Sequence, residues 1–334
     1  MKVVITGGTG FIGRRLAQHL LQRGTLAGPD GRQTAIDEVV LFDLAAPQLP
    51  MAPDKRLKIV AGDVADPAVL RGVIGRTTGS VFHLAAVVSG HAEADTDTGY
   101  RVNLDGTRAV LEACRALGTR PHVVFASSVA VYGGDIPPTV SDDTPLTPQT
   151  SYGAQKAIGE FLVNDYSRKG YVDGRALRFP TIVVRPGRPN RATSSWVSAL
   201  FREPLSGVEM VCPVSREAFM AILSPRRLVE AIVRLHDLPG ERFGFNRALL
   251  LPSISVTVAD MVEALRRAGG AAAVDRIRWE PDPFLQKIAD GWPRFLLAKR
   301  AESFGVHADA GIDEIVQAFI EDDLPAQKAL VAAG

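Results

Sequence analysis

Tyr152 and Lys156 form the residue pair that most directly suggests catalysis. They lie four residues apart in the segment YGAQK, so on a helix they share one face. A lysine ammonium beside a phenol stabilises the phenolate and lowers the phenol pKa from about 10 toward neutral pH. The pair can therefore act as a general base toward an alcohol. Taken alone, the same spacing also occurs by chance on solvated helix faces.

Two serines strengthen the catalytic interpretation. Ser127 and Ser128 follow the apolar run HVVFA, at the end of the predicted strand that precedes the Tyr152 segment. We expect them to point out of the same edge of the sheet as the Tyr152 pair. A serine hydroxyl there could hold a substrate oxygen.

A glycine-rich turn follows the first predicted strand and opens the first predicted helix. Gly7, Gly10 and Gly13 in TGGTGFIG allow a tight turn and a close approach of the backbone to a pyrophosphate at the helix N-terminus. The Gly-x-x-Gly-x-x-Gly spacing is one residue wider at its start than the usual Gly-x-Gly-x-x-Gly. Because the strand–turn–helix context matches, the sequence predicts dinucleotide binding.

Two acidic residues follow the next two predicted strands. Asp43 can accept hydrogen bonds from an adenosine ribose and would repel a 2′-phosphate, and no arginine directly follows it, which favours NAD over NADP. The alternative is that Asp43 caps a turn. Asp63 could meet the adenine amino group, or it could serve as a helix N-cap.

These residues need a sheet that brings several strand ends together. Apolar, β-branched runs predict strands at Lys2–Thr6, Glu38–Phe42, Leu57–Ala61, Ser80–Leu84 and His122–Ala126, with another near Gly174–Arg178. Helical patterns lie between them, near Phe11–Arg23, Pro67–Gly75 and Tyr100–Leu117, and a further helix begins near Ser151. Strands without polar alternation that are separated by helices predict an α/β fold, a doubly wound parallel sheet with helices on both faces.

The alternation of apolar strands and helices stops after Val184, which predicts a second, smaller domain. We expect a dinucleotide-binding domain over 1–184 with about 219–250, and a substrate-binding domain over 185–218 with 251–334. The smaller features expected along the chain are a surface loop at Gly24–Asp37, a substrate-facing loop at Arg185–Pro204, a strand and helix within Phe219–Leu235, a helix at Val256–Ala268 that starts at Ser255 or Thr257, and a linker at Gly269–Val274.

Composition limits the classes of function. The 334 residues are 46% hydrophobic and 22% charged with a net charge of +1, which is typical of a globular protein and gives no electrostatic footprint for nucleic acid. No run approaches the ~20 apolar residues of a membrane helix, and no signal peptide is visible. Two cysteines do not make a disulfide framework, and no metal-ligand spacing occurs. We therefore expect a cytoplasmic protein without a metal, a membrane or a nucleic-acid partner.

A set of short motifs occurs in order across Met1–Gly187. They are TGGTGFIG, Asp43-Leu44, Gly62-Asp63, His83-Leu84-Ala85-Ala86, NLDGT from Asn103, SSVAVYG from Ser127, the Tyr152–Lys156 pair, and RFPT from Arg178. With them the chain resembles the extended short-chain dehydrogenases/reductases. The resemblance implies a catalytic trio of Ser128, Tyr152 and Lys156, with Ser128 chosen over Ser127 because it lies four residues before Tyr132.

The resemblance also implies NAD as cofactor and a homodimer. The cofactor contacts that it implies are Gly7, Gly10, Phe11, Ile12, Gly13, Asp43, Asp63, Val64, Leu84, Ala85, Ala86, Asn103, Tyr152, Lys156, Pro180, Thr181 and Ile182. A plain packing role explains Ala85 and Ala86 equally well, and for Asn103 a structural role is the first interpretation of the residue itself.

The substrate is predicted from the segment after the first domain. Arg185, Arg188 and Arg191 place three cations there, and one of them could clamp a carboxylate. Ser194 and Ser195 add hydroxyl groups suited to a small polyol. Together with Ser127, Ser128 and Tyr152, the residues expected to bind substrate are Arg185, Arg188, Ser194 and Ser195.

Four segments resemble one branch of the family, the D-erythronate dehydrogenases: LRFPTIVVRPGRPNRATSS, REPLSGVEMVCPV, LSPRRLVEA and RIRWEPDP. That branch implies NAD-dependent oxidation of D-erythronate to 2-dehydro-D-erythronate, by hydride transfer from C2 to the nicotinamide with Tyr152 as base. Two alternatives stay open. One is a nucleotide-sugar epimerase or dehydratase that keeps NAD tightly bound, and the other is a non-enzymatic dinucleotide sensor.

Overall fold

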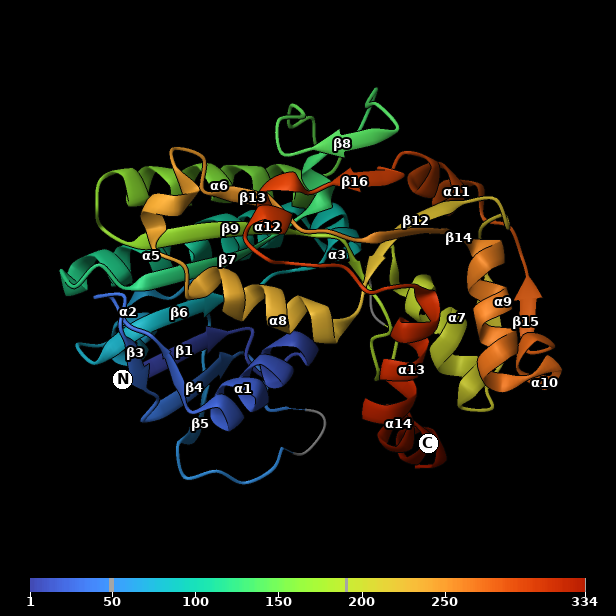
Figure 1. Ribbon diagram of the computed structural model, residues 1–334, viewed down its shortest axis with the longest axis horizontal. Helices are drawn as coiled ribbons and strands as arrows, with labels where there is room; N and C mark the ends of the chain where they lie inside the picture. Colours follow the sequence, from blue (N-terminus) through green and yellow to red (C-terminus); the bar gives the residue numbers. More distant parts are fainter. Residues whose placement is uncertain (48–50, 190–191, 334) are drawn as a thin grey trace. The chain divides into compact units, whose positions relative to one another are not determined.

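A computed structural model describes residues 1–47, 51–189 and 192–333 of the chain (Figure 1). Its contacts divide the chain into two compact units. The first contains Met1–Val131, Thr150–Arg178 and Val229–Leu249, and the second contains Tyr132–Gln149, Phe179–Leu228 and the residues from Leu250 on. None of the helices in the described ranges is long and apolar enough to cross a membrane.

The first unit alternates strands and helices along the chain. Its elements, including those whose ends pass into the second unit, are β1 (Lys2–Thr6), α1 (Phe11–Arg23), β2 (Thr25–Ala27), β3 (Gln33–Ala35), β4 (Glu38–Asp43), β5 (Leu57–Ala61), α2 (Pro67–Val73), β6 (Thr78–His83), α3 (Ser89–Ala94), α4 (Thr96–Gly99), the π-helix η1 (Tyr100–Asp105), α5 (Gly106–Leu117), β7 (His122–Ser128), the 3₁₀ turn η2 (Val129–Val131), α6 (Ser151–Arg168), β9 (Asp173–Phe179), α8 (Pro225–His236), the 3₁₀ turn η3 (Gly240–Phe243) and β13 (Ala248–Leu250).

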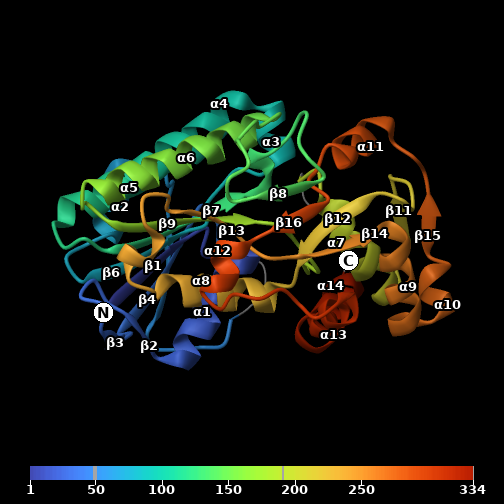
Figure 2. The same ribbon diagram turned by 45° about the horizontal axis from the view of Figure 1, so that its top comes forward.

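The main sheet confirms the predicted α/β class. Within the described residues it has seven strands in the order β13-β9-β7-β6-β1-β4-β5, and β5, β4, β1, β6 and β7 run parallel. The helices α2, α5 and α6 cover one face and α1 and α8 the other (Figures 1 and 2). The order of connection reverses between β1 and β6, the place where doubly wound sheets bind their ligands.

Most predicted elements of this unit are confirmed, with two differences. The expected loop Gly24–Asp37 contains the hairpin of β2 and β3, because Thr25–Ala27 and Gln33–Ala35 pair antiparallel around a turn closed by Gly28 and Arg32. The predicted helix Tyr100–Leu117 has the expected span, but its first six residues wind as the π-helix η1.

The second unit is built from small sheets and helices around its own apolar core. Its elements are β8 (Thr139–Ser141), β10 (Thr181–Ile182), α7 (Ser195–Leu205), β11 (Met210–Cys212), β12 (Phe219–Leu223), β14 (Ile254–Thr257), α9 (Val258–Gly269), α10 (Ala271–Val274), β15 (Ile277–Trp279), α11 (Pro283–Asp290), β16 (Phe295–Leu297), α12 (Lys299–Ser303), α13 (Ile312–Asp322) and α14 (Leu324–Ala332). Buried apolar residues of α7, α9 and α13 meet in the core, among them Leu200, Leu265 and Phe319.

Three expectations for this unit need correction. The expected loop Arg185–Pro204 contains most of α7, and the expected linker Gly269–Val274 contains α10. Short polar and glycine-rich stretches suggest loops, but here packing against the core stabilises helices instead. Phe219–Leu223 groups with the second unit, since β12 pairs with β10 and β14. The helix α9 starts as predicted at Thr257, whose side chain and that of Asp260 form a capping box.

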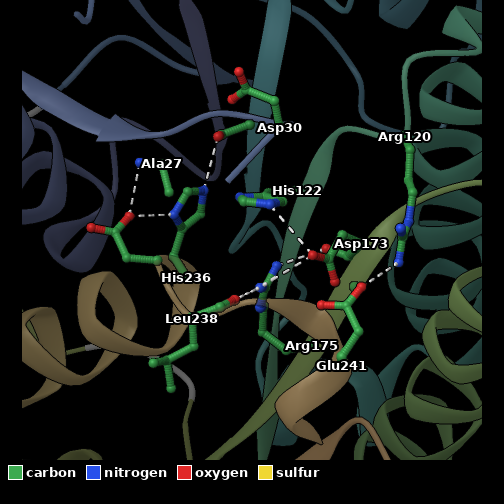
Figure 3. A network of polar contacts seen from close by, with 12 residues as sticks. Ala27, Asp30, Arg120, His122, Asp173, Arg175, His236, Leu238 and Glu241 are labelled. Carbon is green, nitrogen blue, oxygen red and sulfur yellow. Dashed lines mark hydrogen bonds and ion pairs between the residues drawn. The ribbon is translucent and has the colours of Figure 1, made fainter. Parts of the chain in front are cut away.

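A buried polar network lies near the amino ends of β6, β7 and β9 (Figure 3). His236 from α8 bonds the Ser80 hydroxyl at 2.8 Å, and its ring meets the His122 ring edge-on with 4.7 Å between centroids. His122 Nε2 lies 3.4 Å from the Asp173 carboxylate, and the fully buried Arg175 donates to the Asp173 carbonyl at 2.7 Å. The network joins three strands and a helix at the end of the sheet opposite to the predicted site.

Candidate functional site

The glycine turn after β1 packs directly on the segment after β6. Gly7 has φ +67°, and a Cβ there would lie 2.7 Å from the Ala85 nitrogen, so no other residue fits this turn without displacing the neighbouring loop. A Cβ on Gly13 would lie 2.5 Å from the Gly7 carbonyl oxygen. The α1 N-terminus at Gly10 has no side-chain cap, and Gly10 is exposed. A helix N-terminus that has no side-chain cap and follows a glycine turn fits a pyrophosphate.

Asp43 and Asp63 differ in how their carboxylates are used. Asp43 accepts the Thr9 N–H at 3.1 Å and the Leu44 N–H at 2.8 Å, which fixes it beside the glycine turn at the end of β4. Asp63 accepts the Ala65 N–H at 2.9 Å and forms an ion pair with Arg101. The N-cap of α2 is Asp66, so the N-cap alternative for Asp63 is wrong.

A chain of buried hydrogen bonds lies beneath the expected cofactor segment 84–86. Thr107 donates to the Asn103 carbonyl at 2.6 Å, His83 Nε2 lies 2.9 Å from the Thr107 hydroxyl, and His83 Nδ1 lies 2.7 Å from the Thr6 hydroxyl. Burial lowers the pKa of His83 to about 3, so this imidazole is neutral at neutral pH. The chain of bonds joins the ends of β1 and β6 to η1.

Asn103 has the structural role that its residue type suggested. Its amide accepts the Val87 N–H at 2.8 Å and donates to the Val87 carbonyl at 3.0 Å, and it also donates to Gln155 Oε1 at 2.7 Å. It thereby ties the segment after β6 to α6, in the same turn as Tyr152 and Lys156. Of the other expected cofactor residues, Phe11, Ile12, Leu84, Ala85 and Ala86 are half-buried around the glycine turn, and Val64 is buried in the core.

The Tyr152–Lys156 pair lies in the first two turns of α6. Thr150 caps the helix by accepting the Gly153 N–H, and Glu93 from α3 accepts the Ser151 N–H at 2.9 Å. Lys156 is 1% exposed, donates to the Ala126 carbonyl at 2.7 Å, and has its Nζ 5.5 Å from the centre of the Tyr152 ring. Burial lowers the pKa of Lys156 to about 7, against the opposing effect of the Glu160 carboxylate. The ammonium is therefore held beside the phenol and can change its charge near neutral pH.

The two serines at the end of β7 have different surroundings. Ser127 is buried and donates its hydroxyl to Glu160 Oε1 at 2.5 Å. Ser128 is half-buried, and its Oγ accepts the Ala130 N–H at 3.1 Å. Ser127 is thus engaged inside the fold by Glu160, and its expected substrate contact stays a prediction.

Glu160 and Arg178 are residues to which the sequence analysis gave no role. Arg178 from β9 donates Nε to Glu160 Oε1 at 2.9 Å and Nη2 to Oε2 at 2.7 Å, and both side chains are almost completely buried. The spacing of Glu160, four residues after Lys156 on the inner face of one helix, is the sequence feature that could have indicated it.

The remaining predicted residues belong to the second unit. Thr181 and Ile182 form β10 and follow the buried Pro180. The backbone carbonyl of Arg185 accepts a hydrogen bond of 2.9 Å from the Arg202 guanidinium. Arg188 is exposed and lines a cavity of about 530 Å³ beside α7 and α14. Ser194 is the N-cap residue of α7 and Ser195 its first residue. Arg191 lies outside the described residues.

The first unit thus defines a class of protein. A doubly wound sheet, a bare glycine-lined helix N-terminus at the switch point, and a tyrosine–lysine pair on the helix after β7 together define a dinucleotide-binding protein of the short-chain dehydrogenase/reductase type. The model of the NAD dependent epimerase/dehydratase family matches residues 3–242. The chain belongs to this family.

Relatives align along nearly the whole chain. A D-erythronate dehydrogenase of Cupriavidus necator is 56% identical over 96% of this chain and 98% of its own length. A D-erythronate dehydrogenase of Haemophilus influenzae is 41% identical over 97% of this chain and its own full length. Among solved structures, a nucleoside-diphosphate-sugar epimerase from Agrobacterium tumefaciens superposes with a TM-score of 0.90 at 39% identity, covering 98% of this chain and 96% of that one.

Proposed function

We propose that this protein is an NAD-dependent dehydrogenase that oxidises D-erythronate to 2-dehydro-D-erythronate. The observation that carries this proposal is the full-length similarity, at 56% and 41% identity, to two proteins named D-erythronate dehydrogenase. The buried Lys156 beside Tyr152 supports it, because an alcohol oxidation needs a base of this kind.

The glycine turn and the acids around it would hold NAD. The backbone from Gly10 to Gly13 would bind the pyrophosphate and Asp43 the adenosine ribose, where its negative charge favours NAD over NADP. The segments 63–64, 84–86 and 180–182 would line the adenine and nicotinamide ends. When bound, NAD supplies the acceptor for the hydrogen and electron pair that leave the substrate carbon.

In the proposed reaction Tyr152 removes the proton of the C2 hydroxyl. Lys156 donates toward the Ala126 carbonyl and remains beside the phenol, so its positive charge stabilises the phenolate. Ser128 would hydrogen-bond the same substrate oxygen and fix its position, which contributes through orientation. We further propose that Arg185 or Arg188 binds the substrate carboxylate, with Ser194 and Ser195 as hydroxyl contacts.

The first experiment measures NADH absorbance on mixing the purified protein, NAD and a panel of four- to six-carbon sugar acids. NADH formation with D-erythronate, and not with its stereoisomers, is the expected result. The absence of NADH with every acid would overturn the proposal. Arg185→Gln and Arg188→Gln, each measured for KM, identify the carboxylate partner as the one whose loss raises KM.

A second function has a specific observation in its favour. The solved structure that superposes with a TM-score of 0.90 is named a nucleoside-diphosphate-sugar epimerase. Conversion of a nucleotide sugar without net NADH, by protein purified with its own NAD, would favour this alternative. We prefer the dehydrogenase because its named relatives are more similar in sequence.

We also propose a cytoplasmic homodimer that associates through α5 and α6. The side chain of Phe161 on α6 is 65% exposed, which supports an apolar surface on this helix, and both cysteines are free, which accords with a reducing compartment. Analytical ultracentrifugation should give a dimer for the wild type and a monomer for Phe161→Glu. Val211→Glu, which changes an exposed residue of β11, is the matched control and should remain dimeric.

A further inference from the structure

A single carboxylate joins the three elements that carry the proposed chemistry. Glu160 on α6 accepts the hydroxyl of Ser127 at the end of β7 and a bidentate pair of hydrogen bonds from Arg178 on β9. The catalytic candidates lie next to these contacts in the sequence. Lys156 is one turn before Glu160 on α6, and Ser128 directly follows Ser127. The Glu160 side chain therefore fixes α6 against the ends of both strands, immediately behind the base.

The charges around the Lys156 ammonium come from several elements. Tyr152 and Glu160 lie on α6. His83 on β6 is a neutral imidazole whose pKa is lowered by burial and by the charge of Lys156. Arg178 on β9 forms an ion pair with Glu160. On β7 the ammonium meets the Ala126 carbonyl and the Phe125 ring, with 4.8 Å to the ring centre. The η1 side contributes the neutral amide of Asn103, bonded to Gln155. Glu160 is thus the carboxylate that compensates two buried cations.

We propose that Glu160 is a positioning residue for the Tyr152–Lys156 pair, which holds the pair in place and supplies the negative charge that keeps Lys156 protonated. The inference rests on the proposed use of Tyr152 as the base. Glu160 acts through Lys156 and does not itself contact the substrate.

The direction of the electrostatic effect follows from the charges. Without the Glu160 carboxylate, Lys156 would lose the negative charge that opposes the effect of burial on its pKa. Burial would then favour the neutral amine without opposition, so the pKa of Lys156 would fall further below its ordinary value. A neutral amine no longer stabilises the phenolate, and Tyr152 would lose its reactivity at neutral pH.

Two variants that remove opposite charges from the same ion pair test this proposal. The pKa of Lys156 is measured by NMR on cofactor-free protein labelled with [¹³Cε]lysine, with Lys156→Met identifying the resonance. Glu160→Gln should lower the pKa of Lys156 by about one unit or more, and Arg178→Met should raise it. Asp173→Asn, which removes a carboxylate from the opposite end of β9, is the matched control and should leave that pKa unchanged.

Activity provides the second measurement. In Glu160→Gln the alkaline limb of the pH profile of kcat/KM should move to lower pH by the same amount as the pKa of Lys156, with the Kd for NAD changed less than kcat. If Glu160→Gln does not fold because Arg178 is left unpaired, the double variant Glu160→Gln with Arg178→Met removes both charges. The Lys156 pKa of this double variant should lie below that of Arg178→Met, because only the double variant lacks the carboxylate that raises the pKa of Lys156. Equal values in the two proteins would overturn the proposal.

The possible outcomes separate this proposal from the proposed function. A change of the Lys156 pKa in the same direction in both single variants, or no change in either, would overturn the positioning role. Opposite shifts without turnover of any sugar acid would uphold the positioning role and overturn the proposed substrate. The NMR measurement needs neither substrate nor cofactor, so the two results are independent.

Discussion

The two ends of the strands β6, β7 and β9 carry buried polar networks that differ in one respect. At the amino end the network of His236, His122 and Asp173 is closed inside the fold (Figure 3). At the carboxyl end the network of Ser127, Glu160 and Arg178 continues to Lys156 and the half-buried Tyr152. The same strands thus support a structural network at one edge and a reactive one at the other.

The difference is visible in the charge states. Burial lowers the pKa of His236 to about 3, so it stays neutral at neutral pH. Burial alone would raise the pKa of Asp173, but His122, Arg175 and Arg247 outweigh it and hold that pKa below its ordinary range. Lys156, in contrast, has a pKa lowered to about 7. At the amino end, burial together with strong ion-pair partners fixes the charge states at neutral pH. At the carboxyl end, burial outweighs the attraction of Glu160 for the Lys156 ammonium, so the charge of Lys156 changes with pH near neutrality.

The largest effect is expected at the reactive end. Tyr152→Phe removes the base and should lower kcat by about 100- to 10,000-fold, the usual contribution of a general base. The Kd for NAD, measured by quenching of protein fluorescence, should change little because the glycine turn is untouched. Turnover within a few-fold of the wild type would place the base elsewhere.

Asp173→Asn should have the largest effect at the structural end. It leaves the guanidinium groups of Arg175 and Arg247 without their carboxylate, and breaking a buried pair costs about 3–5 kcal/mol. Urea unfolding should show this loss, while kcat of the folded protein stays at the wild-type value. A matching fall in kcat would contradict the separation of the two ends.

The histidine at the structural end should make stability depend on pH. The pKa of His236 is about 3 in the folded protein and about 6.5 in the unfolded chain, so between these values the unfolded state binds one proton more. This contribution is fully present above pH 6.5 and is lost as the pH falls toward 3, with a slope of up to about 1.4 kcal/mol per pH unit.

His236→Gln replaces the imidazole that bonds Ser80 and should be less stable than the wild type at pH 7. Because glutamine does not titrate, the stability of this variant should decline less steeply on acidification. Urea unfolding at pH 7, 6, 5 and 4 measures both slopes. An equal dependence of the unfolding free energy on pH in the two proteins would show that a group other than His236 causes it.

The smallest effects come from a matched pair of serines. Ser80→Ala removes the hydrogen bond to His236 and should cost about 0.5–1.5 kcal/mol of stability with kcat/KM unchanged. Ser127→Ala removes a hydrogen bond to the Glu160 carboxylate and should cost about 1.5–3 kcal/mol and also lower kcat/KM. Equal effects of the two variants on kcat/KM would remove the functional distinction between the ends.

Much of the first unit was predictable from local pattern. Buried parallel strands are continuous apolar runs, so β1 begins and ends at the predicted residues. The bounds of the more exposed edge strand β5 and of α1 also match the prediction. The second unit was harder, because its short strands pair with partners distant in sequence. α7 and α10 lie where composition suggested loops, and their helices depend on packing against α9.

The residues of the candidate site also fall into two groups, those that local sequence predicts and those whose contacts depend on tertiary packing. Local sequence is enough to predict the glycine turn, the position of Asp43 and the Tyr152–Lys156 pair, because each depends on a few neighbouring residues and on one strand or one helix. The hydrogen bond from Ser127 to Glu160 and the ion pair of Glu160 with Arg178 depend on tertiary packing and could not be predicted in this way. These contacts join residues that are 18 to 33 positions apart, and their energies depend on burial that no local pattern specifies.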